Sequence, residues 1–194
     1  ENSVDNRHMV SAVDLLPTIL DIAGLGHPTD LDGRSFHELL NGKTQDKRHF
    51  VVKEYNENAG GSRDPMRAVQ SKRFLYIYNP WSNGSRVFAT ATSSTPTYKR
   101  FKKLAETDIT FAARHAIYQH RVVEELYDVK ADPDCLNNLI DNEEFGDVLT
   151  LHRRRLLTWM RTTDDPLIEI YRDRDNAEKR EAYIQALEQA SIER

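Results

Sequence analysis

The sequence is poor in cysteine and has no long apolar run. A single cysteine, Cys135, occurs among 194 residues, which excludes an internal disulfide and any zinc site built from several cysteines. No apolar stretch approaches the roughly 20 residues that a membrane-spanning helix needs. The first residues, Glu1 to Asp5, have neither the basic segment nor the apolar core of a secretion signal. Because the first residue is not Met, we expect a fragment or a processed product.

Charge is distributed unevenly along the chain. The formal net charge is -4, yet residues 61–103 carry nine Lys and Arg residues against one Asp. A basic segment inside an acidic chain suggests an anionic partner for that face. The run from Lys99 to Lys103 also fits a solvated helix surface, which is the more common role of such a run. A nucleic-acid partner is disfavoured, because no recognised nucleic-acid motif or aromatic platform accompanies the basic residues.

Residues 9–24 have the apolar spacing of an amphipathic helix, and Gly24 is placed to end it. Pro17 lies inside this segment and lacks a backbone donor. The helix is therefore predicted to kink or divide between Asp14 and Thr18, with one of these two residues capping the second half.

Four segments favour β-strands because they are rich in β-branched and aromatic residues. They are residues 50–52, 66–70, 73–79 and 125–129. The second and third are separated by a short polar turn and predict a hairpin. Four strands make a stable antiparallel sheet when a helix covers one face.

The clearest helix is Phe145 to Thr163, whose apolar residues fall on one stripe. It is expected to cover the sheet and to bury Trp159, while Arg153 to Arg155 lie off the stripe and are expected in solvent. A last, highly charged helix over residues 176–190 is predicted to be peripheral or to meet a partner chain. The long segment from Pro80 to Arg121 is predicted to hold two helices, at residues 98–106 and 111–120.

The stretch from Glu124 to Leu139 predicts a strand that ends in a tight turn at Asp132-Pro133-Asp134. Leu136 and Leu139 are expected to point inward from one helical turn. The spacing Glu-Leu-Tyr-Asp, then Asp-Pro, then Asn-Leu resembles the closing signature of the sulfatases. Cys135 stands where that family usually has Glu.

Other segments carry the same resemblance. Residues 10–24 are similar to the segment that closes the sulfatase catalytic domain, and Asp32-Gly33-Arg34-Ser35 is similar to the motif that follows it. This motif reads locally as a turn in which Ser35 or Asp32 caps a short helix, while Arg34 can bind backbone carbonyls or a carboxylate. Residues 65–79 resemble the hairpin of the heparan N-sulfatases, the N-sulfoglucosamine sulfohydrolases.

The resemblance implies an α+β fold in which a small four-stranded antiparallel sheet is packed by a long helix. The sheet is expected to follow the terminal helix of an alkaline-phosphatase-like α/β catalytic domain that is not part of this chain. We expect three parts. Residues 1–47 would end the catalytic domain, residues 48–168 would form the C-terminal subdomain with a helical insertion at 80–121, and residues 169–194 would form a helical tail.

The resemblance also implies the chemistry. In sulfatases a Cys or Ser in a Cys/Ser-X-Pro-X-Arg segment matures to formylglycine, and Asp and Asn side chains hold calcium. Cys135 is followed by Leu-Asn-Asn and does not fit, and Ser94-Thr95-Pro96-Thr97-Tyr98 has Tyr98 where Arg is required. We therefore expect no catalytic residue and no metal ligand in this chain, with the nucleophile and calcium held by the N-terminal domain.

The loop after the first strand is expected to form the rim of the substrate pocket. Glu57 or Asn58 is predicted to hydrogen-bond glycan hydroxyls, and Arg67 with Arg63 is predicted to hold the loop or an anionic group. The alternative is that Arg67 is a buried structural ion-pair partner and Glu57 is merely solvated.

These expectations define a C-terminal portion of a sulfatase that hydrolyses sulfuric esters or N-sulfamates of sugars, inactive as this chain alone. The alternative is a non-catalytic glycan-binding or interaction module derived from a sulfatase. The expected partners are the chain's own N-terminal catalytic domain and a sulfated saccharide, with a homo-oligomer left open and neither nucleic acid nor membrane expected. By resemblance, the compartment is periplasmic, secreted or lysosomal.

Overall fold

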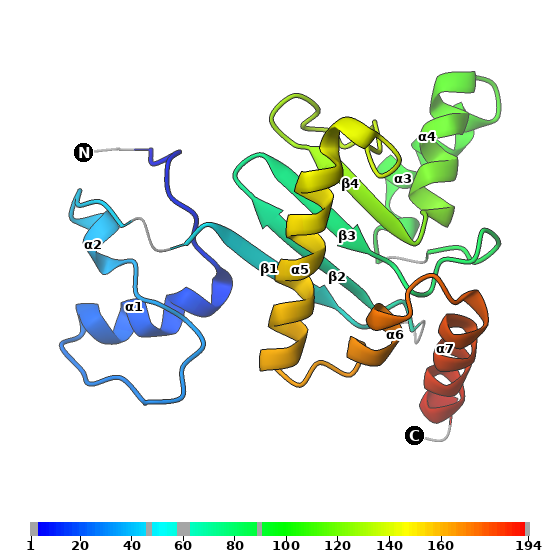
Figure 1. The fold of residues 1–194 in the computed structure, drawn as a ribbon. Coiled ribbons are helices and arrows are strands. Elements are labelled where there is room, and N and C mark those ends of the chain that lie inside the picture. The colour runs from blue at the N-terminus through cyan, green and yellow to red at the C-terminus, as the bar shows by residue number, and fades with distance from the viewer. Residues whose placement is uncertain (1–3, 46–47, 58–62, 89–90, 193–194) are drawn as a thin grey trace. The chain divides into compact units, whose positions relative to one another are not determined.

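The computed structural model describes residues 4–45, 48–57, 63–88 and 91–192 (Figure 1). Its contacts divide the chain into two compact units, Glu1–Val51 and Val52–Arg194. No helix within the described ranges has the length and apolar character needed to cross a membrane. The three-part division at residues 47 and 168 stays a prediction.

The first unit is built around the buried carboxylate of Asp14. A 3-10 turn at Ala12–Asp14 leads into α1 (Leu15–Ile22), and a second short helix, α2, spans His37–Leu40. Asp14 accepts hydrogen bonds at 2.8 Å from the backbone N–H groups of Ser11 and Arg34, and it pairs with Arg48. One carboxylate thus joins three segments of this unit.

The Asp-Gly-Arg-Ser turn fits against the start of α1. A Cβ atom on Gly33 would lie 1.9 Å from the carbonyl oxygen of Val13, so only glycine allows this approach. Further along, Thr18 Oγ1 accepts a hydrogen bond from the Phe36 N–H at 3.0 Å. The motif therefore has a packing role within this unit, and the backbone of Arg34 anchors it.

The predicted helix over residues 9–24 is shorter than expected. Residues 9–11 are not helical, because the Ser11 backbone N–H is bound by the Asp14 side chain. Pro17 causes no break, since it is the third residue of α1, where a backbone N–H has no intrahelical partner. The helix divides instead at Asp14, which precedes α1 without capping it through its side chain.

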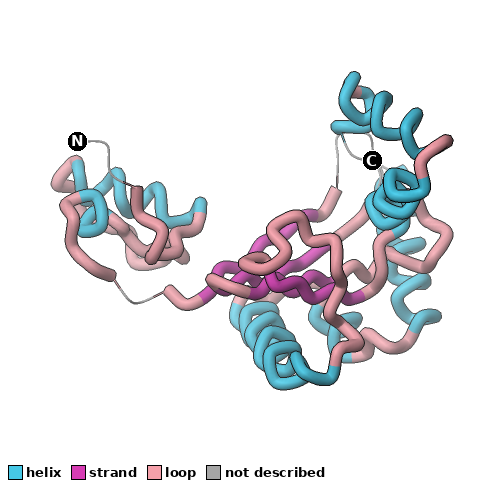
Figure 2. Tube along the Cα trace, turned by 90° about the horizontal axis from the view of Figure 1, so that it is seen from above, coloured by secondary structure: helices cyan, strands magenta, loops and turns pink. Residues whose placement is uncertain are grey.

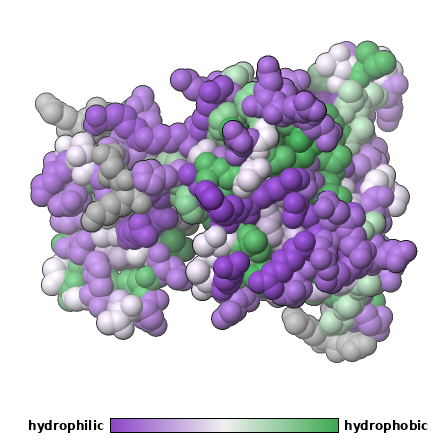
Figure 3. Space-filling model, viewed as in Figure 1, coloured by the Kyte–Doolittle hydropathy of each residue, from purple (hydrophilic) through white to green (hydrophobic). Residues whose placement is uncertain are grey.

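Figure 3 shows green patches in the region of α1, and apolar side chains in and beside this helix remain about half exposed. They are Val10, Val13, Leu15, Leu16, Ile19, Ile22 and Leu25. An exposed apolar face of this extent is typical of an interaction surface.

The predicted sheet has the order β1-β2-β3-β4 and lies in the second unit, apart from the first two residues of β1. The strands are β1 (Phe50–Tyr55), β2 (Met66–Ser71), β3 (Phe74–Tyr78) and β4 (Glu124–Asp128). The hairpin pairs β2 with β3 antiparallel, with Val69 opposite Tyr76, and β3 pairs antiparallel with β4, with Tyr76 opposite Leu126. The α+β fold and the four-stranded antiparallel sheet are confirmed.

One long helix, α5 (Gly146–Thr162), lies along a face of this sheet (Figure 2). It buries Leu156 and Met160 completely, and His152 beside them reaches Ser71 Oγ at 3.2 Å. Two further helices, α6 (Ile168–Arg172) and α7 (Ala177–Ile192), follow it. The last helix buries Ile184 and so belongs to the core of this unit.

Two expectations for α5 were wrong. Trp159 is only half-buried, and the fully buried tryptophan is Trp81 from the insertion. Arg153 is not simply solvated, because its guanidinium donates to both oxygens of Glu124, at 2.8 and 2.6 Å. That carboxylate also accepts from the hydroxyl of Tyr76, so Arg153 ties the helix to the sheet.

The helical turn expected at residues 136–139 is absent. The Asp132 carboxylate accepts the backbone N–H groups of Leu136 and Asn137 at 2.8 Å each, and Cys135 has a left-handed φ of 53°. The chain then runs beside β4, where the Leu139 N–H donates to the Leu126 carbonyl at 2.7 Å. Local side-chain bonds have replaced the helix.

The insertion contains the two predicted helices, and they pack against each other as a helical hairpin. After a 3-10 turn at Ala91–Ser94, α3 spans Pro96–Ala105 and α4 spans Ile109–His120. Thr95 caps α3 and Asp108 caps α4 through side-chain hydrogen bonds to backbone N–H groups. The remaining 3-10 turn, Glu143–Phe145, precedes α5.

Candidate functional site

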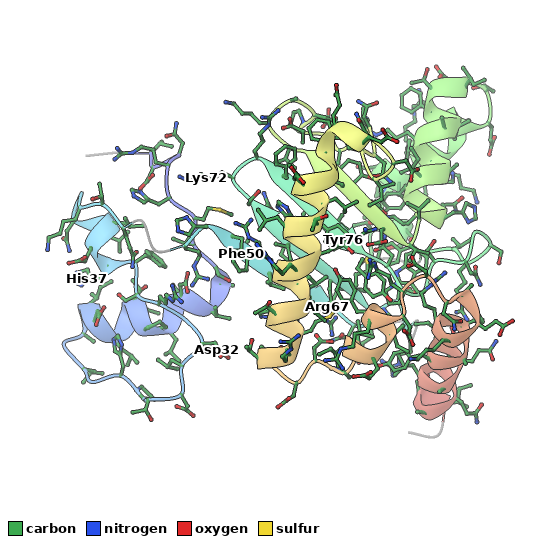
Figure 4. All side chains as sticks on the ribbon, in the orientation of Figure 1. Asp32, His37, Phe50, Arg67, Lys72 and Tyr76 are labelled. Atoms are coloured by element: carbon green, nitrogen blue, oxygen red, sulfur yellow. The ribbon has the colours of Figure 1, made fainter. Side chains whose placement is uncertain are left out.

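Three of the four residues predicted to bind substrate line one pocket of about 290 Å³ in the second unit. These are Glu57, Arg63 and Arg67, and Arg67 is labelled in Figure 4. The fourth, Asn58, lies outside the described residues. The other lining residues are Glu54, Asn56, Pro65, Pro166, Leu167, Tyr183, Leu187, Ala190 and Ser191.

Arg67 is committed to protein partners. Its Nε donates to Asp165 Oδ2 at 2.6 Å, and both side chains are nearly inaccessible to solvent. Its Nη1 donates to the Tyr55 carbonyl at 3.2 Å and to the Asn56 side-chain oxygen at 2.9 Å. These bonds fix the first residues of the loop, which is one of the two roles expected for Arg67. Its contact with a substrate stays a prediction.

Glu57 and Arg63 form an ion pair across the rim of the pocket. The Glu57 side chain is 51% exposed and the Arg63 side chain 15% exposed, so the carboxylate is the more accessible group. With Arg67 held by Asp165, each arginine that lines the pocket in the described ranges has a carboxylate partner.

The lining therefore combines compensated charges with apolar surface. Tyr183 and Leu187 supply the apolar part, from α7. Burial raises the pKa of Tyr183, so its phenol stays a protonated hydroxyl at neutral pH. Such a lining suits a small polar ligand with hydroxyl groups and an apolar face better than it suits a bare anion.

Asp64, which follows Arg63 in the sequence, has a buried carboxyl group that the sequence patterns did not point to. Asp64 is 5% exposed, and its Oδ2 has no hydrogen-bond partner among the described residues. Burial raises the pKa of Asp64 to about 6, although the positive charge of Arg86 acts in the opposite direction. The only signal in the sequence was one acidic residue within a basic segment.

The environment of Asp64 includes aromatic residues from distant parts of the chain. Burial raises the pKa of Tyr55, and the charge of Asp64 acts in the same direction. Tyr55 meets Phe88 edge to face at 5.9 Å, and Phe88 stacks on Trp81 at 5.3 Å. Residues of the insertion therefore support the base of the predicted substrate loop.

Metal ligation is not found near this pocket or elsewhere in the described ranges. No group of three or more His, Cys, Asp or Glu side chains is arranged there to hold a metal ion. The calcium implied by the resemblance thus has no fitting set of donors in this part of the chain.

Comparison with known proteins supports the resemblance to the sulfatases. Residues 1–85 match the family model described as N-sulphoglucosamine sulphohydrolase, C-terminal. The chain is thus similar to the C-terminal portion of the sulfatases. The resemblance to a heparan N-sulfatase-like C-terminal domain is therefore confirmed.

Individual sulfatases align with most of the chain. An ulvan-active sulfatase of Formosa agariphila is 30% identical over 166 residues, which cover 84% of this chain and 31% of that protein. Human N-sulphoglucosamine sulphohydrolase is 28% identical over 173 residues, which cover 82% of this chain and 34% of that protein. The chain spans about a third of the length of these two sulfatases.

A solved structure of a sulfatase shares the fold. The crystal structure described as a putative sulfatase from Bacteroides thetaiotaomicron superimposes with a TM-score of 0.54 at 25% identity. The match covers 82% of this chain and 25% of that one.

Proposed function

We propose that this chain is the C-terminal portion of a sulfatase that hydrolyses sulfuric esters or N-sulfamates of sugars. The family match carries the proposal, and the named activities of the sulfatase relatives support sugars as the substrate class. The chain covers about a third of these relatives, which supports placing the formylglycine nucleophile and calcium in an N-terminal domain outside the chain.

The apolar face of α1 supports a contact with that domain. Side chains such as Leu16, Ile19 and Ile22 are 51%, 52% and 58% exposed. Covering one such side chain contributes on the order of 1 kcal/mol, because roughly half of its surface is still to be buried. The partner proposed for this face is the chain's own catalytic domain.

The proposed contribution of the second unit is to hold the sugar, whereas the other domain performs the chemistry. Glu57 would accept hydrogen bonds from ring hydroxyls, with Asn58 beside it in sequence and Arg63 orienting the Glu57 carboxylate. Arg67 would keep this rim in place through Tyr55 and Asn56. Because the Arg63 charge is already paired with Glu57, this rim would bind the hydroxyl groups of the sugar, and the sulfate group of the sugar would point away from the rim.

Sulfate release tests this proposal. Residues 1–194 and the full-length protein are incubated separately with N-sulfated and O-sulfated glucosamine, and free sulfate is measured. We expect release by the full-length protein and none by residues 1–194. Turnover by residues 1–194 alone would refute the assignment of the chemistry to another domain.

A pair of variants tests the role of the rim. In the full-length protein, Glu57→Gln is expected to raise KM about tenfold with little change in kcat, because the lost bond acts in the ground state and the transition state alike. The control, Glu106→Gln, removes an exposed carboxylate after α3 and is expected to change neither constant. Equal KM values for the two variants would remove Glu57 from the sugar site.

The alternative is a glycan-binding module without catalysis. The pocket is compatible with this alternative, because its described lining residues can bind hydroxyl groups and need no reactive group to do so. Binding of the same sugars by the full-length protein with no release of sulfate would favour this reading.

A further inference from the structure

The helical hairpin of the insertion presents a cationic face that the proposed function does not use. α3 packs its aromatic side against α4, with Phe101 5.3 Å from the ring of His115 and 6.0 Å from that of Phe111. Tyr98 adds a contact at 5.6 Å with His115. The apolar side of α3 is therefore occupied within the hairpin.

The opposite side of α3 carries four exposed cations: Lys99, Arg100, Lys102 and Lys103. At about 100° per residue, Lys99 and Lys103 lie in one row, with the other two flanking it. We call these four residues the α3 cationic face. None of them forms an ion pair or a hydrogen bond through its side chain with another residue in the described ranges, whereas most arginines of the second unit do.

Helix stability does not account for the whole face. Lys102 and Lys103 lie in the last turn, where the helix dipole favours a positive charge. Lys99 and Arg100 lie nearer the start, where it does not. Like charges three and four residues apart also repel by roughly 0.2 to 0.5 kcal/mol per pair. The complete set is therefore most stable when an anion is bound.

We propose that the α3 cationic face binds the sulfate groups of a sulfated polysaccharide, outside the pocket that holds the sugar to be processed. This inference rests on the proposed function for the substrate class. Ten residues of helix extend about 15 Å, so the cations are spread along an extended chain of anions rather than gathered around one small ion. The pocket offers no uncompensated arginine among its described lining residues, so the two surfaces divide the recognition of hydroxyl and sulfate groups.

Other anionic partners fit this face less well. A single-stranded nucleic acid is bound by cations interleaved with aromatic rings on which bases stack. Here the rings of Tyr98 and Phe101 pack against α4 instead. A membrane surface needs an apolar face beside the basic one, and that side of α3 is likewise occupied.

The test compares two variants of residues 1–194 with equal loss of charge. The face variant replaces Lys99, Arg100, Lys102 and Lys103 by Gln. The control variant replaces four other exposed cations of the second unit by Gln, and each of them likewise lacks a side-chain partner among the described residues. They are Lys72, labelled in Figure 4, and Lys130, Arg154 and Arg161. Glutamine is a good helix former, so α3 should persist, and circular dichroism checks this.

Binding to fluorescent dextran sulfate is measured between 50 and 300 mM salt, with neutral dextran as the reference probe. We expect binding to dextran sulfate alone, weakening with salt as counterions are released. At about 100 mM salt the face variant should bind at least tenfold more weakly, with a shallower salt dependence, while the control variant stays within about twofold of the parent.

Three outcomes would overturn the inference. Equal weakening in both variants would show that binding follows net charge alone. Tighter binding to single-stranded DNA, or to vesicles containing anionic lipid, at the same salt would assign the face to another partner. Absence of binding to dextran sulfate would remove the site. None of these measurements depends on hydrolysis, so they are distinguishable from a failure of the proposed function, which is read from sulfate release.

Discussion

The buried pair of Arg67 and Asp165 gives the most direct test of how the pocket is held. Replacing Arg67 by Met keeps the volume of its stem but leaves the Asp165 carboxylate buried without its cation. Breaking a buried pair in this way costs about 3 to 5 kcal/mol. The lost bonds to Tyr55 and Asn56 add to this cost, so Arg67→Met should lie near the upper end of the range.

The reverse variant isolates the charge. Asp165→Asn keeps the side-chain oxygen that accepts from the Leu167 N–H at 2.8 Å, but it leaves Arg67 unpaired. In the double variant neither charge remains, so its cost should be at least about 2 kcal/mol less than the sum of the two single costs. Urea unfolding followed by tryptophan fluorescence measures all three, since both tryptophans, Trp81 and Trp159, belong to the second unit.

Two results would refute this reasoning. Single variants that each cost less than about 1 kcal/mol would show that water reaches the pair and screens it. Costs that simply add would show that the two side chains stabilise the fold independently. In either case the rim of the pocket would not depend on Arg67.

Three further predictions concern other sites. Gly33→Ala should destabilise the first unit by about 2 kcal/mol or more, because the new Cβ meets a backbone carbonyl. The control Gly26→Ala should have little effect, because its Cβ meets nothing within 4 Å, and amide exchange in the first unit compares the two variants. Asp64 holds its proton up to about pH 6 when folded but loses it near 3.8 when unfolded, so stability falls as pH rises through this window. Asp64→Asn should remove that slope and stabilise the protein by about 1 to 3 kcal/mol at pH 7, and an unchanged slope in urea titrations would exclude Asp64 as its source. Trp81→Phe should lower the free energy of unfolding by about 1 to 3 kcal/mol and Trp159→Phe by less than about 1 kcal/mol, since only Trp81 is fully buried. Thermal unfolding ranks the two variants, and the reverse order would contradict the burial of Trp81.

The elements of the second unit were predictable because their signals are local. The strands at residues 50–52, 66–70 and 73–79 are marked by β-branched and aromatic residues, and the helix at 145–163 by its apolar stripe. These patterns depend on the chain's own neighbours, and the structure keeps them with shifts of a few residues at the ends.

The errors came from side-chain contacts, some local and some between distant residues, that an apolar pattern does not encode. Asp14 shortened the first helix by binding the Ser11 backbone, and its own burial depends on Arg34 and Arg48. The incomplete burial of Trp159 could not be read from its stripe, because a helix stripe does not say which of its members meets the sheet. Arg153 gained a partner only because β4 brings Glu124 beside α5.

The candidate site likewise has residues that the sequence predicted and one that it did not. Glu57 and Arg63 were named from the hydrogen-bonding composition of one loop, and the pocket brings them together. Asp64 was missed, because Arg86 and Glu188, whose charges act on its pKa, are distant from it in the sequence. No periodic pattern encodes such an environment.

The insertion therefore acts on the second unit from two sides. Its first part carries Trp81 and Phe88, which support the base of the rim loop through Tyr55. Its helical part holds four cations that no described residue compensates. A single contact with a polymer through α3 would be weak and sensitive to salt. A single sugar in a pocket of about 290 Å³ would also bind weakly, although its hydroxyl contacts depend less on salt. When one polymer occupies both, the second contact becomes intramolecular, and the combined affinity exceeds either one without any new bond. Because the insertion carries the α3 cationic face and also supports Tyr55 at the base of the rim loop, a change in the insertion would alter the fit to the polymer.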